Sequence, residues 1–428
     1  MLTVLGLTFL VTVLVGVPIA FSLGLAAAAT LVAWGQVPLW LLAQRMFTGV
    51  DSFVFMAIPF FILAGELMTT AGILDRLVKF ADGWVGHICG GLAHVTIVAE
   101  MFFSGISGSA VADAAALSAV LSPSLSKQYD TEFGNGVIAS AAMLGPIIPP
   151  SIPMVVYALA AGGVSIAGLF IAGIIPGVVL GGGMMAIAYV IAKRRGYPVR
   201  PRMVNWREFL AQMWDVLPAL LMPVIILGGI LGGIFTATEA AAVAVAYAVV
   251  VGLFLTKELK WRDMPPALVR SAVATSVVFM LIACSNAVSW LLTTQQVPML
   301  AARFLRAYAS SPWVFLLIIN IFLLIVGCLM DLSAAMIMLV PILAPIAVSY
   351  GVDPLHFGFI VTLNLTIGLL TPPVGAILFV VCGISKLTLE RLVIAIWPFL
   401  VFQILVLFLV TYVPWFCVWL PRLLGYGF

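Results

Sequence analysis

Charged residues are scarce in this chain of 428 residues. Asp, Glu, Lys and Arg make up only 8% of it, whereas a soluble globular domain carries roughly 25%. Hydrophobic residues make up 64%, so the polar residues cannot cover a water-soluble particle of this size. Apolar runs of about 20 residues recur along the sequence, each long enough to cross a hydrocarbon core of ~30 Å. Since the runs lack the alternation of barrel strands, the sequence predicts an all-α polytopic membrane protein.

Residue patterns of enzymes and metalloproteins are also missing. The five cysteines and three histidines are dispersed, and no pair has metal-ligand spacing. No sequence context marks a nucleophile, and no Walker-type phosphate loop is present. No basic patch interleaved with aromatic residues indicates nucleic acid as a partner. We therefore expect neither an enzyme nor an ATP-driven pump, and no organic cofactor, so any transport must draw on an ion gradient.

The apolar runs fall into single spans and two interrupted regions. The first run follows no basic segment or cleavage site, so we expect a retained span rather than a signal peptide. The interrupted regions, 88–126 and 313–348, each read as a helix, a polar or glycine-containing break (104–109 and 327–333) and a second helix. Backbone that leaves a helix at membrane depth must be buried or line a wet cavity, which predicts two re-entrant hairpins. The single spans are predicted near 2–17, 19–34, 50–68, 135–160, 165–192, 215–234, 237–256, 270–292, 357–383 and 392–417.

Loop charge predicts the orientation. The loops 193–207 and 257–270 are rich in Lys and Arg, including Arg200 and Arg202 in the first. Two spans separate these loops, so both lie on one side of the membrane. The positive-inside rule assigns that side to the cytoplasm.

The two halves of the chain repeat each other. The segment 67–70 (LMTT) returns at 291–294 (LLTT), and 145–150 (GPIIPP) returns at 368–373 (GLLTPP). In each half an amphipathic stretch (73–85 and 297–309) and then a hairpin lie between the matches. An odd number of crossings separates the equivalent spans, so the halves have opposite orientation. Inverted repeats with interrupted helices at matching positions are typical of secondary transporters, whose site lies at the repeat interface.

The segments 145–150 and 368–373 each lie in the middle of a span. Paired prolines remove two backbone donors and leave carbonyls unpaired, and free carbonyls suit a small hard cation. Ser151 and Thr371 add hydroxyl oxygens. A structural kink is the alternative for one such segment, but two matched segments, each with a polar hairpin tip, favour an ion site.

The hairpin tips carry further polar groups. Ser104, Ser107 and Ser109 alternate with glycines, which indicates a tip that offers hydroxyls and helix ends to an ion or anion, although helix packing also favours Ser and Gly. Asp331 in the second tip can hold a cation, cap the following helix, or do both. We take Ser109, Ser151, Ser333 and Asn364 as candidates for substrate contacts.

Four other acids occur in apolar surroundings. Glu239 follows Thr236 with the spacing of a capping box, and a structural role is favoured. Asp113 can serve the first hairpin. Glu66 and Glu100 receive no role.

Four motifs together resemble those of one known family. They are residues 56–68 (MAIPFFILAGELM), 103–109 (FSGISGS), 145–151 (GPIIPPS) and 235–241 (FTATEAA). The chain resembles, over essentially its whole length, the large membrane subunit of tripartite ATP-independent periplasmic (TRAP) transporters.

This resemblance implies an elevator-type symporter in a bacterial inner membrane. It implies a co-transported Na⁺, a small four-helix membrane subunit and a periplasmic binding protein that delivers an organic acid such as a C4-dicarboxylate or sialic acid. The small subunit is expected as a separate chain, since no four-span block precedes Leu2. The Na⁺ ligands implied are Ser104, Ser107, Gly145, Pro149, Gly327, Asp331, Gly368, Thr371 and Pro372.

The expected organisation follows the repeat. Residues 1–70 and 215–292 are expected to form a scaffold, joined by a cytoplasmic connector at 193–214. Residues 71–192 and 293–428 are each expected to hold an arm helix, a hairpin and transport-domain helices. Two alternatives stay open: a stand-alone Na⁺-coupled dicarboxylate carrier, and a channel or structural membrane subunit.

Overall fold

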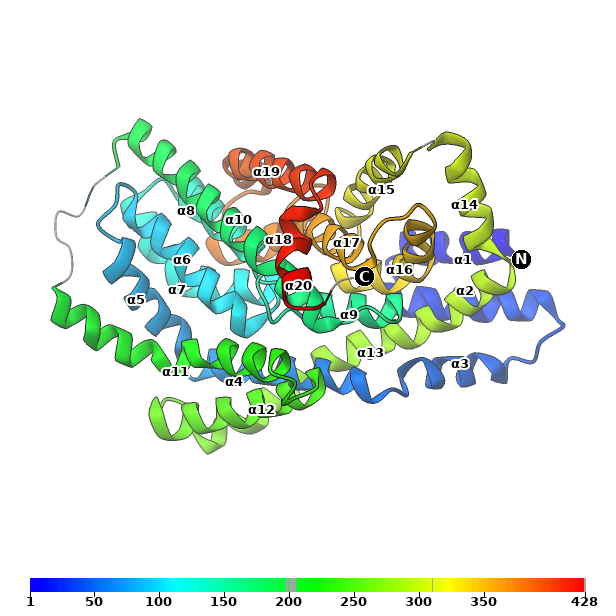
Figure 1. Cartoon of the computed structure of the whole chain (residues 1–428), viewed down its shortest axis with the longest axis horizontal. Helices are drawn as coiled ribbons and strands as arrows, with labels where there is room; N and C mark the ends of the chain where they lie inside the picture. The colour runs from blue at the N-terminus through cyan, green and yellow to red at the C-terminus, as the bar shows by residue number, and fades with distance from the viewer. Residues whose placement is uncertain (198, 200–204, 310, 427–428) are drawn as a thin grey trace.

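The described part of the chain is helical and contains no strand. A computed structural model describes residues 1–197, 199, 205–309 and 311–426, so Arg200 and Arg202 of the basic loop lie outside it. Within the described residues, seven helical segments are long and apolar enough to cross a membrane, and shorter apolar helices accompany them. The predicted all-α, multi-span class is confirmed (Figure 1).

The first half of the chain contains ten helices and one short 3₁₀ turn. They are α1 (Leu2–Leu14), α2 (Ile19–Trp34), α3 (Trp40–Val50), η1 (Phe53–Met56), α4 (Ala57–Thr70), α5 (Ile73–Val85), α6 (Gly91–Ser107), α7 (Ala110–Gln128), α8 (Thr131–Ala142), α9 (Ile152–Ala161) and α10 (Ile166–Arg195).

The second half repeats this order from α11 onward. Its helices are α11 (Trp206–Leu231), α12 (Ala237–Val250), the short turns η2 (Val251–Leu255) and η3 (Trp261–Asp263), α13 (Met264–Thr294), α14 (Val297–Tyr308), α15 (Pro312–Gly327), α16 (Leu332–Ser349), α17 (Pro354–Gly368), α18 (Ala376–Ser385), α19 (Leu389–Tyr412) and α20 (Trp415–Leu423).

Helix positions bear out the repeat. The amphipathic helix α5 begins at Ile73 and α14 at Val297, an offset of 224. The second hairpin helices, α7 and α16, begin at Ala110 and Leu332, an offset of 222. The spans predicted at 135–160 and 357–383 are each interrupted, because α8 and α17 end before the proline pairs and α9 and α18 begin after them. One difference stands out: α13 is continuous, whereas its counterpart is divided into α3, η1 and α4.

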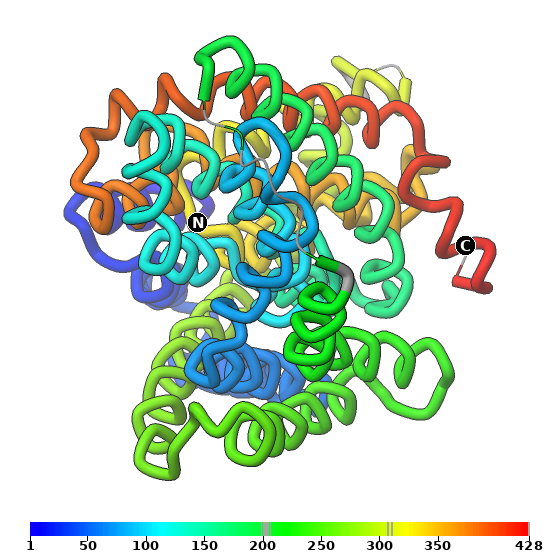
Figure 2. Tube along the Cα trace, turned by 90° about the vertical axis from the view of Figure 1, so that its left-hand side faces the viewer, coloured from blue at the N-terminus to red at the C-terminus, as the bar shows by residue number. Residues whose placement is uncertain are grey.

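The helices form two layers. Figure 1 shows α3, α4, α11, α12 and α13 along the lower side, with the hairpins and interrupted helices above them, and Figure 2 shows the same division from the side. Within the upper layer the halves interlock, since α9 packs against α16 and α18 packs against α7. The upper layer meets the lower through α4 with α6 and α9, and through α13 with α16.

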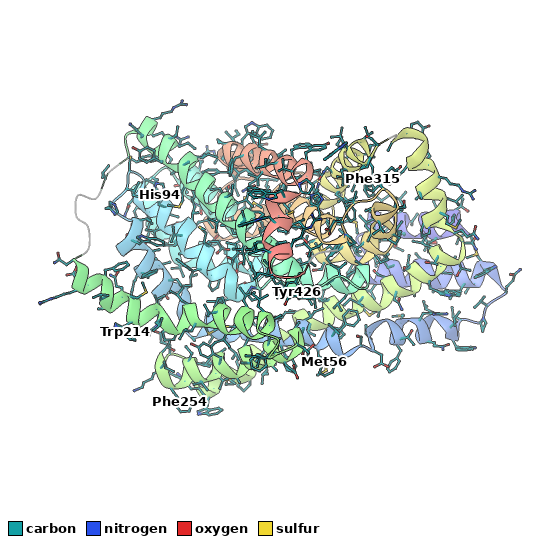
Figure 3. The ribbon with its side chains drawn as sticks, viewed as in Figure 1. Met56, His94, Trp214, Phe254, Phe315 and Tyr426 are labelled. Atoms are coloured by element: carbon teal, nitrogen blue, oxygen red, sulfur yellow. The ribbon has the colours of Figure 1, made fainter. Side chains whose placement is uncertain are left out.

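The outer surface of this bundle is apolar. Trp214 and Phe254 are 72% and 67% exposed and project from the lower edge in Figure 3. Polar side chains such as His94, Asn320 and Gln403 are instead buried. Because apolar groups cover the outside, lipid is the solvent that this surface suits.

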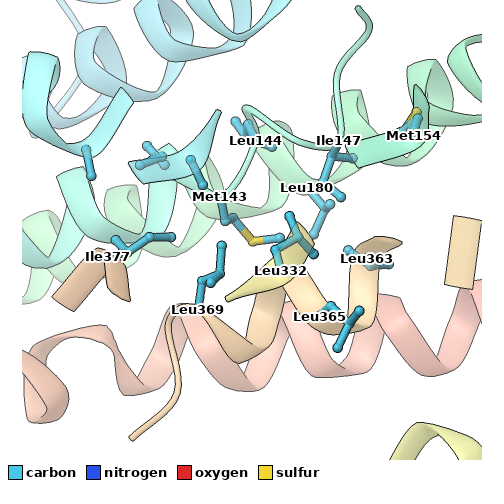
Figure 4. Close-up of a cluster of buried hydrophobic side chains, with 14 of the residues drawn as sticks. Met143, Leu144, Ile147, Met154, Leu180, Leu332, Leu363, Leu365, Leu369 and Ile377 are labelled. Carbon is cyan, nitrogen blue, oxygen red and sulfur yellow. The ribbon is translucent and has the colours of Figure 1, made fainter. Parts of the chain in front are cut away.

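Apolar side chains hold the two interruptions in place. Met143, Leu144 and Ile147 of the first interruption are fully buried, and so is Leu370 of the second. Figure 4 shows Met143 beside Leu332 and Leu369, so the first interruption, the second hairpin and the second interruption share one cluster. The first interruption is therefore enclosed by packed side chains, whereas Pro373 and Val374 of the second are exposed.

One predicted boundary was wrong and one helix was not predicted. The first hairpin break was placed at 104–109, but α6 continues to Ser107 and only Gly108 and Ser109 separate it from α7. Close packing of this helix outweighs the weak helix propensity of Ser and Gly. No helix was predicted at 40–50, where α3 lies, because Gln44 and Arg45 interrupt its apolar pattern. The capping box was predicted correctly: the amide of Thr236 donates to Glu239 at 2.8 Å.

Candidate functional site

The tip of the first hairpin lies directly on the first interruption. Gly108 ends α6 with a φ of +66°, a left-handed conformation that favours glycine. A β-carbon on Gly108 would lie 2.9 Å from the carbonyl oxygen of Pro150, and one on Gly105 would lie 3.4 Å from that of Pro149. The two backbone segments therefore approach each other with no side chain between them.

The tip of the second hairpin repeats this arrangement. A β-carbon on Gly368 would lie 2.5 Å from the Cα of Gly327. The amide of Val374, just after the second proline pair, donates to the carbonyl of Cys328 at 3.2 Å. The Pro149–Pro150 and Pro372–Pro373 peptide bonds are both cis. The structure thus places each tip against the interruption of its own half.

Several oxygen atoms at these two contacts are available to a cation. The carbonyl oxygens of Pro149 and Pro372 accept no hydrogen bond among the described residues. Ser104 donates its hydroxyl proton to Met101 O at 3.0 Å, and Thr371 donates to Ile367 O at 2.9 Å. A hydroxyl that donates in this way keeps its lone pairs for a metal ion. Oxygen ligands of this kind suit Na⁺ better than a transition metal.

A cleft of about 230 Å³ lies where both tips face the lower layer. Ser107 and Ser109 line it from the first tip, and Asp331 and Ser333 line it from the second. The opposite wall comes from α4 and α13, with Ile62, Gly65, Glu66, Thr69, Ala274 and Val278. Four of the residues predicted to bind ion or substrate therefore meet in one cavity.

Ser151 and Asn364 lie outside this cleft. The hydroxyl of Ser151 donates to Pro146 O at 2.6 Å and accepts from Met154 N at 3.3 Å, so it caps α9. The amide of Asn364 donates to Asn320 Oδ1 at 2.7 Å and is buried. Both side chains have structural partners inside the protein.

Asp331 does cap the helix that follows it. Its Oδ1 accepts from the amides of Ser333 and Ala334 at 2.9 and 3.3 Å. The carboxylate also lines the cleft, so the capping role and a role in the cleft are compatible.

A pair of buried carboxyl groups lies behind the first tip. Glu100 on α6 and Asp113 on α7 are both 0% exposed and lie close enough to interact with each other. Asp113 also lies beside Ser107 and against Gly145, where an added β-carbon would overlap its Oδ2. None of the four carboxyl oxygens makes a hydrogen bond of ordinary geometry with a described residue. Two adjacent buried carboxyl groups cannot both carry an uncompensated charge, so a proton or a cation must accompany them.

Sequence reasoning did not find this pair. Asp113 was assigned to the first hairpin, and Glu100 received no role. The available signal was that each acid lies in one arm of the same predicted hairpin.

An ion pair lies in the wall of the cleft. Arg270 on α13 donates from Nε to Glu66 Oε2 at 2.9 Å. Both groups are partly exposed, so we expect the pair to contribute well under ~1 kcal/mol to stability. The ion pair is relevant to the site because Glu66 lines the cleft.

Comparison with known proteins points to one family. A family model described as the "Tripartite ATP-independent periplasmic transporter, DctM component" matches residues 7–416. The C4-dicarboxylate TRAP transporter large permease protein DctM of Pseudomonas aeruginosa is 42% identical over 405 residues, covering 94% of each chain. The sialic acid TRAP transporter large permease protein SiaM of Vibrio cholerae is 39% identical, over 99% of this chain and 98% of the relative.

A solved transporter structure shares the fold. The crystal structure of the YdaH transporter of Alcanivorax borkumensis superposes with a TM-score of 0.62, over 90% of this chain and 88% of that one. The sequences are 16% identical, so this likeness concerns the fold alone.

Proposed function

The chain belongs to the DctM component of the tripartite ATP-independent periplasmic transporters, and on this premise we propose that it imports a small organic acid together with Na⁺ by an elevator movement. As a transporter permease it is not an enzyme. The observation that carries the proposal is the meeting of two hairpin tips and two interrupted helices around one cleft.

Na⁺ binds, in this proposal, where each tip contacts its interruption. Ser104, Ser107, Gly145 and Pro149 surround the first ion, and Gly327, Gly368, Thr371 and Pro372 surround the second. Free carbonyl and hydroxyl oxygens at both contacts support this assignment. The buried carboxyl groups of Glu100 and Asp113 add negative potential beside the first site. Asp331 adds negative charge near the second.

The anion binds in the cleft between the tips. Relatives are named for C4-dicarboxylates, sialic acid and 2,3-diketo-L-gulonate, all of which carry carboxylate groups. The N-terminus of α7 opens onto this cleft at Ser109. Helix N-termini favour negative ligands, and Ser109 and Ser333 offer hydroxyls to them. Ser151 and Asn364, as structural neighbours, would support the site from outside the cleft.

The moving part consists of the two hairpins and the interrupted helices. Residues 71–192 and 293–428 carry them, and 1–70 and 215–292 form the scaffold that the cleft faces, with 193–214 as the cytoplasmic connector. The hairpins re-enter the bundle without crossing the bacterial inner membrane. A separate small four-helix membrane subunit and a periplasmic binding protein complete the system.

Reconstitution tests the whole proposal. The chain would be placed in proteoliposomes with its small subunit, and uptake of labelled succinate and N-acetylneuraminate would be measured with the binding protein added or omitted. We expect uptake only with the binding protein present and Na⁺ outside. Uptake of equal rate with K⁺ outside and no binding protein would refute the proposal.

Asp331 allows its capping role and its charge to be separated. Asp331→Asn keeps an oxygen that can accept from Ser333 and Ala334 but removes the charge. A charge of this kind at ~4 Å in water-like surroundings contributes about 1 kcal/mol, so we expect the Na⁺ concentration for half-maximal uptake to rise about fivefold. Asp331→Ala should show the same rise and also lose about 1 kcal/mol of stability with the cap.

Thr371→Ala should likewise weaken Na⁺ activation.

Thermal unfolding and Na⁺ titration of uptake measure the two effects separately. Ser311→Ala, at the cap of α15 away from the cleft, is the matched control and should lower stability without changing Na⁺ activation. If Asp331→Asn and Thr371→Ala both keep wild-type Na⁺ activation, the second ion site is wrongly assigned.

A further inference from the structure

A second cavity, of about 400 Å³, lies farther along the same scaffold helix. Ser285, Asn286 and Ser289 of α13 and Thr48 of α3 give it a polar wall. The hydroxyl of Ser285 is buried, at 3% exposure, and makes no hydrogen bond with any described residue. A buried hydroxyl without a partner is costly, so Ser285 has a hydrogen bond to offer to a group that enters this cavity.

The cavity and the cleft lie at different depths along α13. Ala274 and Val278 line the cleft, whereas Ser285 and Ser289 line the cavity. A rise of 1.5 Å per residue separates the two levels by about 16 Å. The cavity is nearer the C-terminal end of α13, which the positive-inside rule assigns to the side away from the cytoplasm.

The second hairpin spans both levels. Asp331 and Ser333, at its tip, line the cleft, and Ile337 and Pro341, farther along α16, line the cavity. α13 runs beneath α16 in Figure 1, and the two helices are in contact. A displacement of about 16 Å along α13, estimated from the helical rise, would bring the tip to the level of Ser285 and Ser289.

The inverted repeat relates the two walls. The offset of 224 carries Ile62 and Gly65, which line the cleft, onto Asn286 and Ser289, which line the cavity. In the present state the first tip lies on α4, since a β-carbon on Gly65 would be 3.4 Å from the Cα of Ser107. In inverted-repeat transporters alternating access is largely a rigid-body movement of one bundle against the other, and the repeat makes the cavity wall the counterpart of the wall on which the first tip now lies.

The second tip has a residue equivalent to Ser107. Ser107 lies two residues before Ser109, the cap of α7, and Leu329 lies two residues before Asp331, the cap of α16. The counterpart of the Gly65–Ser107 contact is therefore a contact between Ser289 and Leu329. Leu329 is 54% exposed in this state, so it is available for a second contact.

We propose that Ser285, Asn286 and Ser289 form the scaffold wall on which the second tip docks when the site opens away from the cytoplasm, so that these residues complete the binding site for the organic anion in that state. This inference rests on the elevator movement proposed above. The hydroxyls of Ser285 and Ser289 would then donate to anion oxygens. Asn286 is held in place by α3, since its amide donates to Arg45 O at 2.8 Å.

Paired cysteines test the docking without any knowledge of the substrate. Ser289→Cys and Leu329→Cys would be combined in a chain whose native cysteines are replaced, and membranes would be treated with Hg²⁺. A linked pair is protected from labelling by a polyethylene glycol maleimide, which a gel shift reports. We expect severalfold more protection than in a Ser276→Cys/Leu329→Cys control, because Ser276 lies on the exposed face of α13. The Gly65→Cys/Ser107→Cys pair, adjacent in this structure, should also be protected.

The experiment distinguishes a failure of the docking proposal from a failure of the transport proposal. Protection of the Gly65–Ser107 pair without protection of the Ser289–Leu329 pair would overturn the proposal, provided that Met330→Cys in place of Leu329→Cys also fails. Size-exclusion chromatography of each variant identifies any that misfold. Protection of the Ser289–Leu329 pair in a chain that imports no acid in the reconstitution assay would refute the transport proposal but leave the docking contact established.

Discussion

Replacing Gly368 by alanine is expected to abolish Na⁺-dependent transport while leaving the chain folded. The new β-carbon would lie 2.5 Å from the Cα of Gly327, and the nearest atoms belong to backbone rather than to a flexible side chain. The second tip must therefore move away from the second interruption. Overpacking of this kind costs about 3 kcal/mol at the upper end of its usual range, which corresponds to roughly a hundredfold loss of affinity for a Na⁺ held between the two segments.

A graded series checks this prediction. In Gly327→Ala the β-carbon would lie 3.1 Å from Gly368, so a smaller loss is expected. Gly383→Ala, on α18 with nothing within 4 Å, is the control and should behave like the wild type. Thermal stabilisation by Na⁺ relative to K⁺ gives the affinity without a transport assay. If Gly368→Ala retains wild-type stabilisation by Na⁺, the ion is not held at this contact.

The interruptions could be predicted because their cause is local. A proline blocks the backbone carbonyl four residues before it, and α8 ends at Ala142, four residues before Pro146, as α17 ends at Gly368, four residues before Pro372. The repeat could be predicted for a similar reason, since matched segments at one offset survive in the sequence itself.

The exact end of α6 could not be predicted in the same way. Ser104 and Gly105 have weak helix propensity, yet both are fully packed in the hairpin and remain helical. Tertiary contacts set the end of α6, and such contacts cannot be recognised in a single sequence. The helix α3 was not predicted because its amphipathic pattern is too short and too polar to be recognised as a membrane span.

The pairing of Glu100 with Asp113 depends on how the two arms of the hairpin turn about each other. Two residues of irregular backbone, Gly108 and Ser109, fix that turn. A different turn would carry the acids to different faces of the hairpin. Their pairing is thus a property of the fold rather than of any motif.

This pair leads to the second large effect, which is expected for Asp113→Asn. The substitution removes a buried charge beside Gly145 and Ser107 without changing the size of the side chain. A carboxylate ~6 Å from a cation, at an effective dielectric constant of 20, contributes about 3 kcal/mol. We therefore expect the affinity for Na⁺ to fall roughly a hundredfold and uptake at ordinary Na⁺ concentrations to be lost.

Stability without Na⁺ distinguishes this role from a structural one. Two adjacent buried carboxyl groups destabilise a protein when no cation accompanies them, so Asp113→Asn should unfold at the same temperature as the wild type in K⁺, or at a higher one. In Na⁺ the wild type should gain stability and the variant should not. Glu132→Gln, which alters a partly exposed carboxylate paired with Arg391 at 3.4 Å, should leave the response to Na⁺ unchanged. A variant that is destabilised in K⁺ yet still stabilised by Na⁺ would show that Asp113 supports the hairpin rather than the ion, and the negative potential at the first site would then have to come from carbonyl and hydroxyl oxygens alone.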